Sequence, residues 1–184
     1  MRRVKYFIAN SLDNFIARSN GAVDWLFMDG DYGMATFFKS IDTVLIGRKT
    51  YEFILSQNKR DKKSSSKKVK NKTTSNSMKS YVFSRTIKKP LDEDVKIISE
   101  NAGEFIRNLK KQPGKDIWLM GGGGLARSLF AEGVVDEISL GVHPVLLGSG
   151  IPLFCEIGKQ INLELTECKP HPNGVVQLLY RVKN

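Results

Sequence analysis

Residues 116–130, DIWLMGGGGLARSLF, decide the fold. An apolar run typical of a buried strand ends at four consecutive glycines, and the apolar spacing of an amphipathic helix follows at once. The start of a helix presents N–H groups without helical partners and the positive end of the helix dipole, so it can bind a phosphate. Glycine, which has no Cβ, lets a ligand approach the backbone closely. The alternative is a turn that only joins two elements, but four glycines make it costly in conformational entropy.

The glycines do not belong to either of the two common nucleotide-binding motifs. Gly121, Gly123 and Ala126 have the spacing of the dinucleotide fingerprint of doubly wound sheets, which needs an acidic residue about 20 positions further on. The sequence there reads VLLGSG, and the 58 residues after Ala126 are too few for the remaining strands. No Gly-Lys-Ser/Thr follows the glycines, which excludes a P-loop. The stretch therefore predicts a nucleotide cofactor bound by another fold.

Two further predicted strands end in residues suited to anions. The strand at 43–46 is followed by GRKT at 47–50, where a helix begins with two cations that its dipole disfavours unless an anion is bound. Ordinary surface placement of these cations is the alternative. The strand at 79–83 is followed by a hydroxyl and a cation at 84–85. Parallel strands would bring all three ends to one edge of a sheet, where ligands of open α/β sheets bind. A dinucleotide with an added 2′-phosphate could use all three.

The rest of the chain alternates predicted strands with helices, then ends in strands alone. Strands separated by helices are expected to be parallel, with right-handed crossovers, and the last strands antiparallel. We expect a single α/β domain over residues 1–184, with a mixed, mostly parallel sheet, helices on both faces and an antiparallel C-terminal strand pair. The predicted strands are 4–10, 43–46, 79–83, 95–99, 116–120, 135–145, 163–167 and 175–182, and the helices 31–40, 50–55, 102–111 and 125–131.

The net charge of +10 is concentrated in one segment. Residues 57–79 carry nine Lys or Arg and one Asp, which gives +8, and the other residues sum to +2. This low-complexity insert has no aromatic residue and almost no apolar one, so we expect a mobile surface loop. An electrostatic arm for a polyanion is the alternative. The missing aromatics argue against nucleic-acid binding, because nothing would stack on bases.

The remaining composition narrows the class of protein. No apolar run approaches the roughly 18 residues of a membrane span. Cys155 and Cys168 have no motif spacing, which fits a reduced, cytoplasmic protein better than a disulfide framework. His143 and His171 are the only histidines and have no ligand spacing, so no metal site is expected.

Five segments follow one another in order over nearly the whole chain: SLDNFIA (11–17), LIGRKTYE (45–52), YVFSRT (81–86), WLMGGGGLARSLFAEGVVDEI (118–138) and HPVLLGSGIPLF (143–154). Together they resemble the dihydrofolate-reductase-like superfamily, most closely the branch related to the C-terminal reductase domain of riboflavin biosynthesis. The resemblance implies an eight-stranded sheet and an NADPH-dependent reductase that transfers hydride to a heterocyclic or carbonyl substrate. The reference reaction that it implies is reduction of 5-amino-6-(5-phosphoribosylamino)uracil, with dihydrofolate as the second candidate substrate.

The resemblance also implies roles for individual residues. Phosphates should be held at the helix start by Arg48, Lys49 and Thr50, with Arg48 or Lys49 reaching the 2′-phosphate. Following the classical folate reductases, the Gly121–Gly122 peptide is expected to be cis. The predicted cofactor site comprises Ala9 and Ile16 near the nicotinamide, Gly47, Arg48, Lys49 and Thr50, Ser84 and Arg85 at the adenosine end, and Gly121, Gly122, Gly123, Gly124 and Leu125 at the pyrophosphate and ribose.

Three residues are predicted to contact the substrate. Asp31, at the head of a predicted helix, matches the place of the substrate carboxylate in folate reductases; if buried, it could help to supply a proton. Its alternative role is that of an ordinary acid in a helix's first turn, and Asp29 is close enough to be confused with it. Trp25 would either form an aromatic wall of the substrate pocket or pack in the core. Asp13 is the third predicted substrate-binding residue.

The sequence departs from the family pattern at two places and leaves other functions open. Asn14 stands where a glycine follows Ser-Leu-Asp, in a turn that tolerates asparagine in the left-handed conformation. Met120 stands where the riboflavin reductases commonly carry an acid, which puts the natural substrate in doubt. Two alternatives remain, a nucleotide-binding protein without turnover and polyanion binding through the insert. The family and the long apolar strand at 135–145 suggest a homodimer.

Overall fold

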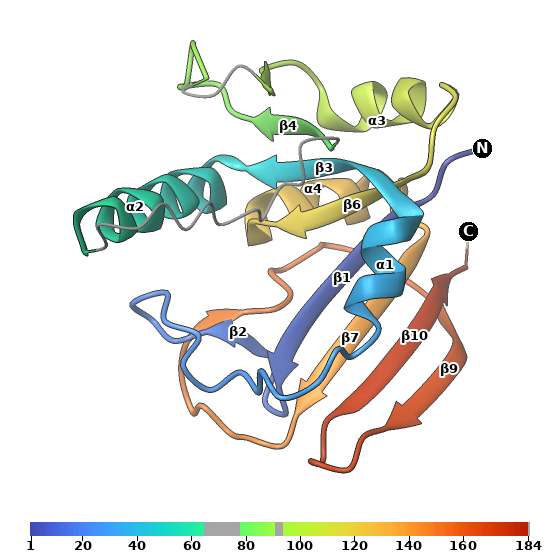
Figure 1. Ribbon diagram of the computed structural model, residues 1–184. Helices are drawn as coiled ribbons and strands as arrows, with labels where there is room; N and C mark the ends of the chain where they lie inside the picture. The colour runs from blue at the N-terminus through green and yellow to red at the C-terminus, as the bar shows by residue number, and fades with distance from the viewer. Residues whose placement is uncertain (65–77, 91–93, 184) are drawn as a thin grey trace.

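One sheet of eight strands organises the chain (Figure 1). The structure, a computed structural model, describes residues 1–64, 78–90 and 94–183. The first six strands in the sheet order are all parallel, β10 is antiparallel to β7, and β9 is antiparallel to β10. This confirms the predicted mixed, mostly parallel sheet with an antiparallel C-terminal pair. The order across the sheet is β5 (Val95–Ile98), β4 (Lys79–Phe83), β3 (Ile41–Gly47), β6 (Asp116–Gly121), β1 (Val4–Ser11), β7 (Glu137–His143), β10 (Val176–Val182) and β9 (Leu163–Pro170).

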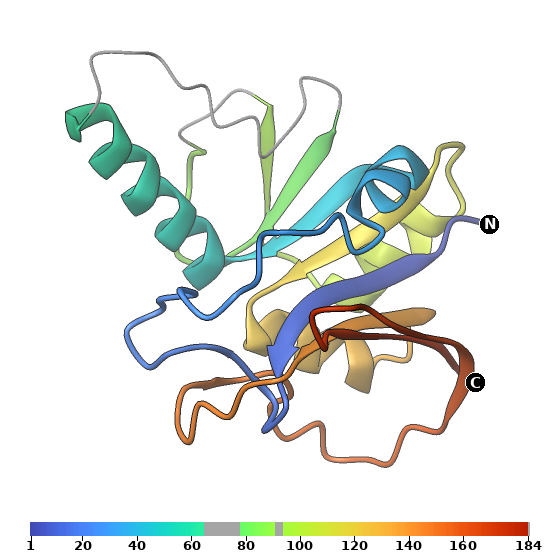
Figure 2. The same ribbon diagram turned by 60° about the horizontal axis from the view of Figure 1, so that its bottom comes forward.

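Helices cover both faces of the sheet, as predicted (Figures 1 and 2). On one face, α3 (Ala102–Lys110) and α4 (Gly123–Ala131) bury the main apolar cluster, in which Leu45, Leu119 and Leu129 are fully covered. On the other face, α2 (Arg48–Ser64) contributes Tyr51 to a smaller cluster. The helix α1 (Met34–Ser40) lies on this same face, where Phe37 stacks on Phe7 with ring centroids 4.2 Å apart.

Two short strands were not predicted. The strands β2 (Phe15–Ala17) and β8 (Ile151–Pro152) form a separate antiparallel pair. Segments of three and two residues are too short to show the alternation of apolar and polar residues that identifies a strand.

Several boundaries differ from the prediction for local reasons. The helix expected from residue 31 begins at Met34, because Tyr32 and Gly33 have left-handed φ values of 45° and 78°. The helix expected at 50–55 begins at Arg48 and continues to Ser64. It therefore includes residues 57–64 of the insert, which were expected to form a loop. Once a helix is nucleated, each further residue adds a hydrogen bond at little cost, and Lys, Arg and Gln are good helix formers. Insert residues 65–77 lie outside the described residues.

Within the described parts of the chain, none of the helices combines the length and the apolar character needed to cross a membrane.

Candidate functional site

Three neighbouring strands end side by side at the carboxyl edge of the sheet. The order β4-β3-β6 is parallel throughout, and Gly47 at the end of β3 pairs with Phe83, the last residue of β4. On the other side of β3, Ile46 pairs with Gly121 at the end of β6. The predicted convergence of the three anion-suited strand ends is therefore present in the fold.

A cavity of about 520 Å³ opens at this edge. It is lined by six predicted cofactor residues, namely Gly47, Arg48, Ser84, Arg85, Gly124 and Leu125. Most of its remaining wall comes from the end of β5 and the start of α3, which were not assigned to the site from the sequence. The strand–turn–helix pattern at 95–102 is the same signal that was used at 43–50 and at 116–130. The remaining lining residues are Phe83, Ile98, Ser99, Glu100, Asn101, Ala102, Gly103, Ser128 and Glu132.

The cavity contains two cations in different settings. Arg48 forms an ion pair with Glu52 one turn along α2, with both nitrogen–oxygen distances at 2.9 Å. Arg85 is exposed and has no ion pair with a described residue. Exposed ion pairs are weak, so Arg48 can exchange Glu52 for a bound anion at little cost. Two arginines at a cavity mouth suit the bidentate recognition of phosphate.

Ser84 helps to shape the cavity wall. Its hydroxyl oxygen accepts hydrogen bonds from the N–H groups of Thr86 (3.2 Å) and Ile87 (2.9 Å). The hydroxyl thus closes the turn that presents Arg85. Lys49 is exposed in the first turn of α2, and Thr50 faces Gly122 across the gap between the two strand ends.

The backbone conformation explains the first two of the four glycines at residues 121–124. Gly121 and Gly122 have φ values of 129° and 86°, which side-chain-bearing residues rarely adopt. The predicted cis Gly121–Gly122 peptide is wrong, since no peptide bond among the described residues is cis. The two left-handed glycines turn the chain from β6 into α4 with a trans bond between them. A Cβ on Gly122 would also lie 3.3 Å from the Cα of Gly47.

The last two glycines differ from each other. A Cβ on Gly123 would lie 2.7 Å from the Sγ of Cys155, so a neighbouring side chain explains this glycine. Gly124 has no left-handed φ, and no atom of the described residues outside its chain neighbours and its own helix backbone lies within 4 Å of its Cβ position. It lies in the first turn of α4, where N–H groups have no helical acceptor, and it lines the cavity. Packing and backbone geometry account for the other three glycines but not for Gly124.

Ala9 and Ile16, which were predicted to lie near the nicotinamide, do not line this cavity. Ala9 is on β1, where it pairs with Gly141 of β7, and Ile16 is on β2 and packs against the main cluster. Asp13 fastens the turn after β1 to the loop after β7. Its carboxylate accepts hydrogen bonds from the N–H groups of Leu147 (3.1 Å) and Gly148 (2.7 Å), as well as from the hydroxyl of Ser11 (2.6 Å). The turn also contains Asn14 at φ 63°, the left-handed conformation that was predicted for it.

Asp31 is exposed, so the burial that would favour a proton-supplying role is not present. Its carboxylate accepts a hydrogen bond from the N–H of Ala35 at 3.0 Å, which is the ordinary role of an acid beside a helix start. Asp29 instead bonds the hydroxyl of Tyr32 and the amide of Asn173. The Tyr32 hydrogen bond is the main reason why the pKa of Asp29 lies below its usual range.

Trp25 is buried and packs edge-on against His143, with ring centroids 5.3 Å apart. Phe27 and Tyr32 approach the same imidazole at 5.3 and 6.2 Å. His143 ends β7 and pairs with Ser11 at the end of β1. The segment between β2 and α1 therefore packs across the carboxyl ends of these two strands, as the blue trace in Figure 1 shows.

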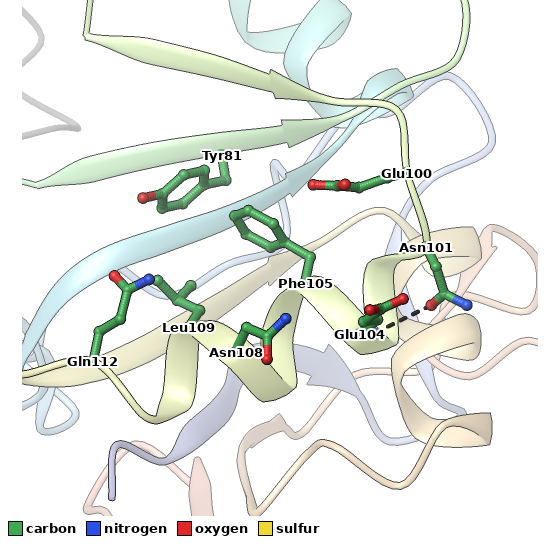
Figure 3. A pocket seen from close by; sticks show the side chains of 8 residues that line it. All are labelled: Tyr81, Glu100, Asn101, Glu104, Phe105, Asn108, Leu109 and Gln112. Carbon is green, nitrogen blue, oxygen red and sulfur yellow. Dashed lines mark hydrogen bonds between the residues drawn. The ribbon is translucent and has the colours of Figure 1, made fainter.

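A second, smaller cavity of about 180 Å³ lies between α3 and strand β4 (Figure 3). It shares Glu100 and Asn101 with the larger cavity. Asn101 caps α3 by accepting the N–H of Glu104 at 3.2 Å. Two glutamates and no cation line this space, so it is poorly suited to phosphate.

Comparison with known proteins identifies the family. The model of the RibD C-terminal domain matches residues 2–177, and the chain belongs to this family. The uncharacterized protein YyaP of Bacillus subtilis (strain 168) is 41% identical over 179 residues, which cover 97% of this chain and 94% of YyaP.

Two solved structures show the same fold. A protein of Shewanella sp. PV-4, provisionally assigned to riboflavin biosynthesis, has a TM-score of 0.82 at 24% identity and is covered completely, as is this chain. Dihydrofolate reductase of Enterococcus faecalis, solved with NADP(H), has a TM-score of 0.68 at 15% identity, with 99% of this chain and 97% of that chain covered. The predicted dihydrofolate-reductase-like fold and its relation to the riboflavin branch are thereby confirmed.

Proposed function

We propose that the protein is an NADPH-dependent reductase that transfers hydride to a small heterocyclic or carbonyl substrate. The observation that carries this proposal is the convergence of three strand ends on one cavity lined by Arg48, Arg85 and the start of α4. A single phosphate would need only one such end, whereas a dinucleotide with a 2′-phosphate has enough negative groups for all three. The family and the structural likeness to a reductase solved with NADP(H) support the same conclusion.

The residues present fit this cofactor, whose nicotinamide would supply the hydride. Arg85 and Arg48 would bind the 2′-phosphate side, with Lys49 in reach from the same helix turn. The N–H groups at the start of α4 would bind the pyrophosphate, and the absence of a side chain at Gly124 would let it come close to the backbone. Ala9 and Ile16 would flank the nicotinamide on the side of β1. Asp31 stays a proposed proton source, although it would have to lose its contact with Ala35.

The substitution Gly124→Ala tests the cofactor site separately from the fold. Alanine in a helix is more stable than glycine by up to about 1 kcal/mol, and none of the described residues obstructs a Cβ at this position. We expect unchanged or raised thermal stability without ligand, together with a smaller stabilisation by NADPH. Thermal unfolding with NADPH, NADH and no ligand measures both effects, since binding to the native state alone raises the melting temperature.

Two further variants sharpen the experiment. Arg85→Ala should reduce the preference for NADPH over NADH, because it removes a cation from the cavity. Arg127→Ala is the matched control, since Arg127 is exposed on α4 and does not line the cavity. Full NADPH stabilisation of Gly124→Ala would exclude the proposed approach of the cofactor to this glycine.

Oxidation of NADPH against pterins, pyrimidines and quinones would separate a reductase from a nucleotide-binding protein without turnover. The dimer, the cytoplasmic location and the single domain over 1–184 stay predictions. The alternative of polyanion binding through the insert also stays a prediction. Most of the insert, residues 65–77, lies outside the described residues.

A further inference from the structure

The strand β9 forms an open edge of the sheet (Figure 1). Among the described residues it pairs with β10 and with no other strand, and all eight of its residues are exposed. Its Leu165 side chain is one of the more exposed large apolar groups, at 52%. The strand at the other edge, β5, has only four residues, and β7 lies inside the sheet between β1 and β10. A long exposed edge with apolar side chains is a template for another strand.

An irregularity in β9 decides which of its side chains share a face. Glu167 pairs with Leu179 and Leu165 pairs with Tyr180, so Thr166 is an extra residue between the two pairs. The Thr166 hydroxyl donates to the carbonyl of Leu179 at 3.0 Å, which fastens the bulge to β10. Paired residues share a face, and the alternation of β9 therefore shifts by one position at the bulge. One face carries Leu163, Leu165, Cys168 and Pro170, and the other carries Glu164, Glu167 and Lys169.

This bulge makes β9 complementary to a second copy of itself. Two copies of an edge strand that pair antiparallel are related by a two-fold axis perpendicular to the sheet, and opposed residues must then lie on the same face. A regular strand of eight residues cannot pair over its full length in this way, because its first and last residues lie on opposite faces. The extra residue in β9 removes that mismatch. The full-length register places Leu163 opposite Pro170, Glu164 opposite Lys169, and Leu165 opposite Cys168 of the second copy.

The side chains in this register suit each other. By symmetry the pair between Glu164 and Lys169 forms twice, and opposite charges across two strands stabilise their pairing. Glu164 now has only an exposed ion pair with Arg181 at 3.5 Å, which is weak, and Lys169 has no ion pair with a described residue. On the other face, the exposed leucines and Cys168 of both copies would form one continuous apolar row.

The backbone of β9 is also oriented for pairing. The N–H of Lys183 donates to the carbonyl of Asn162 at 2.9 Å, so these two residues form a hydrogen-bonded pair between the strands. The direction of the N–H groups alternates along an antiparallel strand, and those of Leu163 and Leu165 therefore point away from β10. The partner of Leu163, Val182, agrees with this, because its N–H donates to Asp136 on the side of β7 at 2.9 Å.

We propose that β9 is the interface of a homodimer, in which the sheets of two copies join edge to edge about a two-fold axis between Thr166 and Glu167. The inference does not rest on the proposed function. The interface lies at the end of the sheet order opposite to β4 and β5, which border the larger cavity.

Charge reversal tests the interface. Lys169→Glu or Glu164→Lys places like charges opposite each other twice in the dimer, whereas the double variant restores opposite charges in reversed order. Sedimentation equilibrium of the full chain should show a dimer whose dissociation constant rises roughly tenfold in each single variant. In the double variant it should return close to the original value. Arg127→Glu is the matched control, since it reverses an exposed charge on α4 and should leave the dimer unchanged.

Amide hydrogen exchange tests the register. The N–H of Leu165 should be protected in the dimer and lose this protection in Lys169→Glu at a concentration where that variant is monomeric. The N–H of Glu164, which points toward β10, should be protected in both and shows that the strand is still folded. A chain that is monomeric at all concentrations would overturn the inference. So would single variants that dimerise as tightly as the original chain, a double variant that does not recover, or an unprotected Leu165 amide in the dimer.

Discussion

Gly47 and Gly122 bring the ends of β3 and β6 into direct backbone contact. A Cβ on Gly47 would meet the carbonyl oxygen of Gly121 at 3.2 Å and the Cα of Gly122 at 3.3 Å. Neither obstacle is the tip of a side chain that could rotate away. The glycine at the end of β3 is therefore needed for packing, whereas packing does not explain Gly124.

We expect Gly47→Ala to lower the free energy of unfolding by about 1–3 kcal/mol, the range for overpacking a tight site. Urea denaturation measures this loss against Gly124→Ala, for which no loss is expected. Equal stability of the two variants would contradict the proposed difference between the glycines.

At the scale of elements, Asp13 joins the turn after β1 to the loop after β7. The Ser11 hydroxyl and the N–H groups of Gly148 and Leu147 outweigh burial and lower the pKa of Asp13 below its ordinary value of 3.8. A lowered pKa in the folded state means that the stabilisation is complete above the ordinary pKa and is lost as the pH falls through the folded one.

The connection between these two loops should therefore weaken under acid conditions, below about pH 4. The amides of Leu147 and Gly148 should lose protection there, which means that they exchange faster relative to their intrinsic chemical rate. Asp13→Asn should show this lower protection already at neutral pH. Exchange that does not depend on pH beyond its intrinsic chemical rate would show that the carboxylate does not hold the loop.

Helices and strands whose apolar residues recur with a clear period could be predicted from the sequence, and the shorter elements could not. The eight strands of the main sheet all showed an apolar run or alternation, whereas β2 and β8 are too short and depend on pairing between distant segments. The cavity was predicted at three strand ends, but its wall at Asn101 and Gly103 was missed. The burial of His143 against Trp25 was also missed, because it follows from the path of an irregular segment that has no sequence period.

At the scale of the whole molecule, Arg2 links the start of the chain to the opposite end of the sheet from the cavity. Its side chain is 3% exposed, bonds the hydroxyl of Thr43 at 2.6 Å, and also contacts Asp42 and the carbonyl of Lys115. These contacts connect β1 with β3 and with the loop before β6.

Arg2→Met should lower the free energy of unfolding by about 2–4 kcal/mol, because it leaves the half-buried Asp42 carboxylate without its cation and removes the buried hydrogen bond to Thr43. Chemical denaturation checks this, with NADPH binding measured in parallel and expected to be unchanged. Arg18→Met is the control, since the Arg18–Asp24 pair is exposed on both sides and its loss should not be measurable. Similar losses in the two variants would contradict the role given to burial.

Gly124 sets helix stability against the close approach proposed for the cofactor. Alanine there would favour the helix, and none of the residues that the structure describes obstructs it. A library of variants selected only for survival of heating should acquire alanine at position 124 repeatedly and keep glycine at position 47. A library selected for growth that depends on turnover should keep both. Glycine therefore leaves α4 less stable than alanine would, at the position where the cofactor is proposed to approach the cavity wall.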